Sequence, residues 1–149
     1  MNDAGPMSSA KDFDFLLGRW RVRHRRLKRR LEGCTDWEIF GGTSEARQLM
    51  AGLGNVDDNL IELPAGPYRA VSLRAFDPQT RQWAIWWLDG RAPTQIDVPV
   101  RGGFANGVGL FFADDTFEGK AIRVRFTWSG ITDASATWEQ AFSEDGGNT

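Results

Sequence analysis

The residues best suited to chemistry lie in one basic segment near the start of the chain. His24, the single histidine among the 149 residues, stands between Arg23 and Arg25. An imidazole changes charge near neutral pH, so it can serve as a general base, a metal or haem ligand, or a polar group in a pocket. The neighbouring arginines would lower its pKa and repel a cation. We therefore expect His24 to line a pocket or to hydrogen-bond in the core, and we assign no catalytic residue.

The other reactive groups lack the partners that chemistry needs. Cys34 is the only cysteine, which excludes an internal disulfide and a multi-cysteine metal site. Two pairs of aspartates are adjacent in the sequence, Asp57–Asp58 and Asp114–Asp115. Adjacent carboxylates on a strand point to opposite faces, and neither pair has the spacing of a calcium loop. The sequence therefore predicts no metal site and no cofactor.

Positive charge is concentrated in the same segment as His24. Eight cationic residues and no acid lie between Arg19 and Arg30, although the whole chain has a net charge of −2. Such a run can bind nucleic acid. Here, however, the arginines alternate with apolar residues, as they would on the outer face of a strand. We expect a solvated outer face paired with acidic neighbouring strands, and no nucleic-acid partner.

Alternation of this kind recurs along the chain. The strand from Arg19 places Trp20, Val22 and His24 on one face, and a bulge near Arg25–Arg26 would bring Leu27 and Leu31 back into phase. Gly41–Gly42 predicts a break or sharp bend in the second strand. The turn Asp77–Thr80 joins the clearest hairpin. Further strands are expected at 37–40, 43–48, 56–63, 68–76, 83–88, 98–104, 108–112, 122–128 and 136–142.

These strands, with almost no helix, predict an all-β fold. Seven tryptophans and ten phenylalanines against one tyrosine favour a β-rich interior or an aromatic-lined cavity. We expect a disordered leader over residues 1–11 and a single domain over 12–149, with a short helical turn at Asp12–Leu17 before the first strand. No signal peptide or membrane-spanning run is evident, which predicts a cytoplasmic protein with no membrane partner.

Several motifs resemble those of a known family. Gly18-Arg19-Trp20 resembles the Gly-x-Trp start of the calycin barrels, which include the lipocalins. Together with FDFLLGRWRVRHRRL, GLGNVDDN, FDPQTRQWAIWW, DDTFEGKAIRVRFTW and WEQAFSEDGGNT, it resembles a bacterial family of unknown function placed near the lipocalin-like barrels. The resemblance implies an antiparallel lipocalin-like β-barrel of about nine strands and supplies no activity. In that family a further Trp-containing strand follows the final turn, and related barrels that bind haem do so through a histidine near the C-terminus, which this sequence lacks.

The aromatic residues then provide the functional hypothesis. A barrel lined by them would bind a small hydrophobic or amphipathic ligand, with Arg74 as a polar anchor for a carboxylate; a solid core is the alternative. A second hypothesis is an enzyme that uses His24 or Glu139 in the same cavity. A third is a homodimer formed through Trp83–Leu88 or the strand edge near Phe142. The expected ligand-binding residues are Trp20, His24, Trp37, Arg74, Trp87, Phe126 and Trp138.

Overall fold

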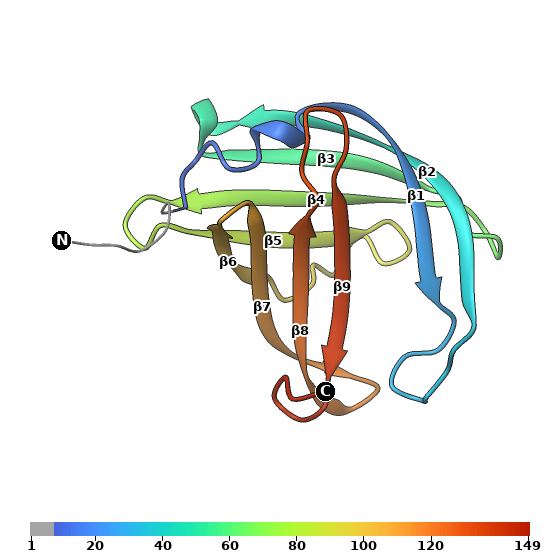
Figure 1. Ribbon diagram of the computed structural model, residues 1–149. Helices are drawn as coiled ribbons and strands as arrows, with labels where there is room; N and C mark the ends of the chain where they lie inside the picture. The colour runs from blue at the N-terminus through green and yellow to red at the C-terminus, as the bar shows by residue number, and fades with distance from the viewer. Residues whose placement is uncertain (1–7) are drawn as a thin grey trace.

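The computed structural model describes residues 8–149 as an antiparallel sheet curled into a half-barrel (Figure 1). Its nine described strands follow one another in chain order. Two 3-10 turns, η1 (Asp14–Leu16) and η2 (Met50–Gly52), accompany them, so the predicted all-β antiparallel fold with a short N-terminal helical turn is confirmed. The strands are β1 (Gly18–Leu27), β2 (Trp37–Leu49), β3 (Gly54–Ile61), β4 (Tyr68–Asp77), β5 (Gln82–Asp89), β6 (Val100–Ala105), β7 (Val108–Phe117), β8 (Lys120–Ser129) and β9 (Thr137–Ser143).

The first strand shows how the sequence pattern sets the two faces of the sheet. Trp20 and His24 lie on the concave inner face, where His24 pairs with the buried Phe40 of β2. The register with β2 runs unbroken to Leu27, so the bulge predicted at Arg25–Arg26 is wrong. β1 ends at Leu27 instead. Leu31 reaches the main core cluster from the loop that follows, with a φ of 61°.

The paired glycines of β2 do not break the strand. β2 continues through Gly41 and Gly42, contrary to the predicted interruption. Gly42 faces the interior at a close approach of strands: a Cβ there would lie 2.5 Å from the Leu60 carbonyl oxygen and 3.2 Å from Nε2 of His24. Any side chain at this position would displace the β3 backbone, so glycine allows β1, β2 and β3 to curl together.

The chain enters the sheet through a segment seated against the β4–β5 turn and against β5 and β6. Of the leader expected over 1–11, residues 1–7 lie outside the described residues, and Ser8 is buried. The Ser8 carbonyl accepts a hydrogen bond of 2.7 Å from the Arg81 guanidinium. Arg81 follows the Asp77–Thr80 turn, and the β4–β5 hairpin predicted around that turn is confirmed.

The main core lies under η1. Phe13, directly before η1, is 1% exposed and makes edge-on contacts with Trp83 and Phe104, with ring centroids 4.9 and 5.0 Å apart. Trp83 on β5 and Phe111 on β7, which flank Gly102 of β6, are also fully buried. A smaller cluster of Phe40, Ile61 and Ala70 lies apart from it. The segment around η1 therefore plugs one end of the half-barrel, and loop residues such as Leu31 add to the cover of the core.

Candidate functional site

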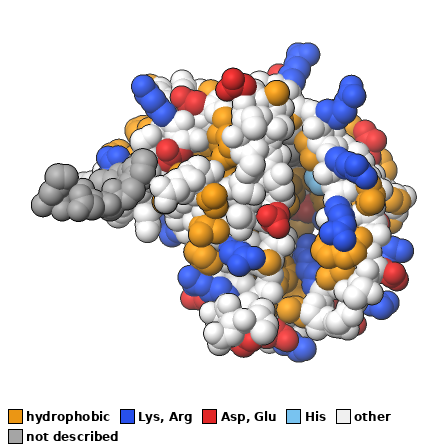
Figure 2. Space-filling view, in the orientation of Figure 1, with side chains coloured by type: hydrophobic (Ala, Val, Ile, Leu, Met, Phe, Trp, Pro, Cys, Tyr) orange, Lys and Arg blue, Asp and Glu red, His pale blue; other side chains and the backbone are white. Residues whose placement is uncertain are grey.

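A cleft runs along the inner face between the two ends of the sheet. Within residues 8–149, β1 and β9 are the terminal strands and each is paired on one side only. Successive antiparallel pairings make them run in the same direction, as their arrows do in Figure 1. Figure 2 shows this side of the molecule hollowed between the two strand edges, with hydrophobic and charged side chains along the hollow. The candidate site is therefore the inner face beneath this cleft.

Aromatic side chains line the β9 side of the cleft. Trp138 pairs with the buried Trp128 of β8 and so faces inward, yet it is 41% exposed. Its ring meets Phe126 edge-on at 5.1 Å, and Phe142 follows it on the same face of the strand. Because these side chains project into the concave face, their exposure reflects an uncovered interior.

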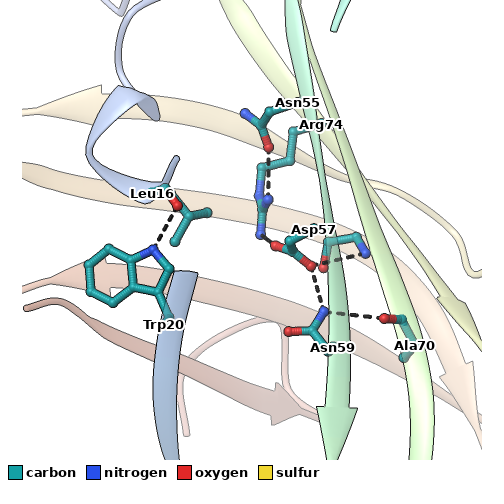
Figure 3. A network of polar contacts seen from close by, with 8 residues as sticks. Leu16, Trp20, Asn55, Asp57, Asn59, Ala70 and Arg74 are labelled. Carbon is teal, nitrogen blue, oxygen red and sulfur yellow. Dashed lines mark hydrogen bonds and ion pairs between the residues drawn. The ribbon is translucent and has the colours of Figure 1, made fainter. Parts of the chain in front are cut away.

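The β1 side contributes Trp20 and His24. The Trp20 indole donates a hydrogen bond of 2.7 Å to the Leu16 carbonyl, which fixes the ring against η1 (Figure 3). The His24 imidazole stacks on Phe40 with ring centroids 5.0 Å apart. Burial, and secondarily the positive charge of Arg26, lower the pKa of His24 below its ordinary value of 6.5. His24 is thus a neutral, partly apolar wall of the cleft at neutral pH.

A polar network crosses the inner face of β3 and β4 (Figure 3). Arg74 forms an ion pair of 2.6 Å with Asp57, and both side chains are 5% exposed. The Arg74 guanidinium also donates to Asn55 Oδ1 at 2.9 Å, and Asn59 Nδ2 donates to Asp57 Oδ1 at 2.5 Å. The Ser72 amide donates to the same carboxylate oxygen at 3.2 Å. The charge of Arg74 is therefore neutralised within the fold, and the carboxylate expected to bind it is supplied by Asp57.

Two buried N–H groups near this network have no acceptor among the described residues. They are Arg74 Nε and the indole Nε1 of Trp128. The Arg74 Cζ lies 5.8 Å from the Trp128 ring and 5.1 Å from the Phe13 ring, so the two donors belong to one neighbourhood beneath the plug. Unsatisfied buried donors are unusual in proteins and are favourable positions for an acceptor oxygen.

The structure brings most of the predicted site residues to the inner face. Trp20, His24, Arg74, Trp87, Phe126 and Trp138 face it, Trp87 through its pairing with the buried Ser72. Trp37 does not: it lies on the outer face, 44% exposed, with the Arg25 guanidinium 4.0 Å above its ring. Glu139, suggested as a catalytic carboxylate, also faces outward, since its neighbours Trp138 and Gln140 face inward.

Sequence reasoning missed the polar residues of β3. The sequence predicts a strand over 56–63 but gives its polar residues no role, whereas Asn55, Asp57 and Asn59 share the inner face with the buried Ile61. Their alternation with Val56, Asp58 and Leu60 was the available signal. It was obscured because the polar residues of this strand point inward and two of the three outward ones are apolar.

Two hollows lie on the outer face of the sheet. One of about 220 Å³ is bordered by Ala84, Trp86 and Arg101, and one of about 520 Å³ by Arg21, Arg23 and Glu62. Both are open surface depressions lined largely by outward-facing side chains of neighbouring strands. Neither brings together groups that could act on a substrate.

No metal-binding cluster or membrane-spanning helix contributes to this inner face within residues 8–149. Among residues 8–149, no group of three or more histidine, cysteine, aspartate or glutamate side chains is placed to hold a metal ion. No helix in that part of the chain has the length and apolar character needed to cross a membrane. Neither a protein-family model nor a curated protein matches the chain. The fold and site thus define a curled antiparallel half-barrel whose inner face combines exposed aromatic rings with a neutralised polar network.

Proposed function

We propose that the protein binds a small hydrophobic or amphipathic molecule on the inner face of the half-barrel, without transforming it. The observation that carries this proposal is Trp138, an inward-facing tryptophan that remains 41% exposed beside Phe126. Removing apolar surface from water stabilises a complex by about 25 cal/mol per Å². An aromatic-lined concave face supplies that surface. We include in this proposal the lipocalin-like classification that the sequence motifs suggest.

The polar network suggests which end of the ligand enters first. Arg74 Nε and Trp128 Nε1 are buried donors without acceptors among the described residues, while the charge of Arg74 is matched by Asp57. An uncharged acceptor, such as a hydroxyl or carbonyl oxygen, would satisfy them without adding a buried charge. The hydrocarbon part of the ligand would then lie along Trp138 and Phe142 toward the cleft.

Dye binding tests the proposal with a matched pair of tryptophans. N-phenyl-1-naphthylamine, an uncharged dye that brightens in apolar surroundings, should bind saturably at one site. Trp138→Ala should weaken binding about tenfold because it removes apolar contact area. Trp37→Ala is the control, since Trp37 is similarly exposed (44% against 41%) but lies on the outer face. Equal losses in both variants, or binding that does not saturate, would contradict the proposal.

Native mass spectrometry of freshly purified protein gives an independent readout. A co-purified small molecule that is retained by the wild-type chain and Trp37→Ala, and lost from Trp138→Ala, would support the inner-face site. A molecule retained equally by all three proteins would place binding elsewhere.

A further inference from the structure

The edges of β1 and β9 face the cleft with unpaired backbone groups. Both strands end the described sheet and run in the same direction, so direct pairing between them would have to be parallel. One extended segment running antiparallel to both would instead continue the pattern of every other pair in the sheet. Free strand edges readily accept such a segment because its main chain satisfies their N–H and C=O groups.

The outer face of β1 carries positive charge that its own sheet leaves largely unmatched. Arg19 pairs with Glu45 of β2 at 3.7 Å. Arg21, Arg23 and Arg25 form no ion pair within residues 8–149, since β2 places Thr43, Gly41 and Ile39 beside them. The prediction that acidic neighbouring strands match this run is therefore correct for one of the four outward arginines of β1. Carboxylates on a new strand at the free edge would complete the pairing, because cross-strand neighbours interact directly.

The inner side of the same gap is largely apolar, with Gln140 of β9 and Arg26 of β1 as polar exceptions. Val22 on β1 and Phe142 on β9 are half-buried, and Trp138 is still more exposed. A strand lying between them would turn alternate side chains toward these residues. Those side chains would be apolar, while the intervening ones would face the arginines.

The ends of the gap are bounded, which favours an extended chain over a folded domain. The Arg30 guanidinium, in the β1–β2 loop, lies 4.8 Å above the Phe142 ring of β9. Leu31 of that loop, and Ile131 and Ala136 of the β8–β9 loop, pack against the main core cluster. Two copies meeting edge to edge through β1 would also place arginines opposite arginines.

We propose that the cleft binds an extended segment of a partner polypeptide, seven to ten residues long, in which acidic and apolar side chains alternate. The length is set by β9 and β1, which have seven and ten residues. The segment joins the sheet between β1 and β9, antiparallel to both. Its carboxylates pair with Arg21, Arg23 and Arg25 on the outer face, and its apolar side chains cover Trp138 and Phe142.

The test uses three synthetic ten-residue peptides labelled with fluorescein. One alternates Glu with Val and Phe, the second replaces every Glu with Lys, and the third has the composition of the first with its acids grouped in one block. Anisotropy should show that the alternating acidic peptide binds more tightly than either of the others. Amide hydrogen exchange should slow in β1 and β9 on binding. Equal affinity for the three peptides, no binding, or protection confined to other strands would overturn the proposal.

A charge reversal makes the test specific to the β1 face. Arg21→Glu/Arg23→Glu should weaken the acidic peptide and strengthen the Lys peptide, each by about tenfold. Arg47→Glu/Arg101→Glu changes the net charge equally on outward positions of β2 and β6 and should leave both affinities unchanged. Identical shifts in the two double variants would show a non-specific charge effect and overturn the proposal. The dye experiment above is run without peptide and depends on Trp138 rather than on the β1 arginines, so its outcome can be distinguished from that of the charge reversal.

Discussion

The plugged end of the half-barrel and its open side belong to the same curled sheet and follow the same alternation, but their inward side chains differ in burial. Beneath η1, Phe13, Trp83 and Phe111 are at most 1% exposed. Along the cleft, Trp138 faces inward from β9 and stays 41% exposed. The two regions differ in whether another element covers the inner face. A strand pattern therefore supplies inward side chains, and a second layer decides whether they form a core or a binding surface.

The polar network marks the boundary between these regions. Arg74 lies against the plug, with its Cζ 5.1 Å from the Phe13 ring, and its partner Asp57 connects to Asn59 further along the inner face. Burying an ion pair costs solvation free energy that its own attraction seldom exceeds. The Arg74–Asp57 pair lies between the plugged end and the cleft, where it can orient a ligand that enters through the cleft.

The largest expected effect tests the plug directly. Phe13→Ala should lower the free energy of unfolding by about 3–5 kcal/mol, because it removes a fully buried ring and leaves a cavity. Trp138→Ala should cost about 1 kcal/mol or less, since that side chain is already 41% exposed to water. Urea denaturation followed by far-UV circular dichroism measures both. Equal costs would mean that the two regions are sealed alike and would remove the basis of the comparison.

The buried pair should give the next largest effect. Asp57→Leu leaves Arg74 charged and unpaired in the interior, and should lower the free energy of unfolding by about 3 kcal/mol. The double variant Asp57→Leu/Arg74→Met should be less destabilised than Asp57→Leu alone, because the isolated charge is gone. Urea denaturation of the wild type, both single variants and the double variant measures the coupling. Additive costs would show that the pair does not act as a unit.

The sequence predicted the sheet better than it predicted what covers the sheet. Alternation identified β1 and β8 because their inward positions are mostly apolar and their outward positions charged or polar. The inward polar residues Asp57 and Asn59 reverse that pattern. The sequence therefore predicted the strand β3 but not the polar network on its inner face. Trp37 was assigned to the cavity by residue type, whereas its position three residues before the inward Phe40 places it outside. Phe13 is buried because the short turn that follows it packs against the sheet. The periodicity of the local sequence does not reveal that tertiary contact.

The smallest expected effect is the pH dependence of stability that arises from His24, which lines the open side of the half-barrel. Burial and Arg26 lower its pKa in the folded chain below the ordinary 6.5. Between the folded and the ordinary value, the unfolded chain therefore binds more protons than the folded one. The free energy of unfolding should accordingly fall as pH drops from about 6.5 toward the folded pKa, and His24→Gln should remove that dependence.

Nuclear magnetic resonance can measure this pKa without ambiguity, because the chain has one histidine and hence one imidazole Hε1 signal. Arg26→Gln should raise the pKa of His24 partway toward 6.5, since it removes a neighbouring positive charge but leaves the burial that is the larger cause. Arg47→Gln, on the outer face of β2, should leave it unchanged. A pKa at or above 6.5 in the wild-type protein would show that water reaches His24 freely. The cleft wall would then be as hydrated as the outer face, and the inner face would lose its distinction as an apolar site.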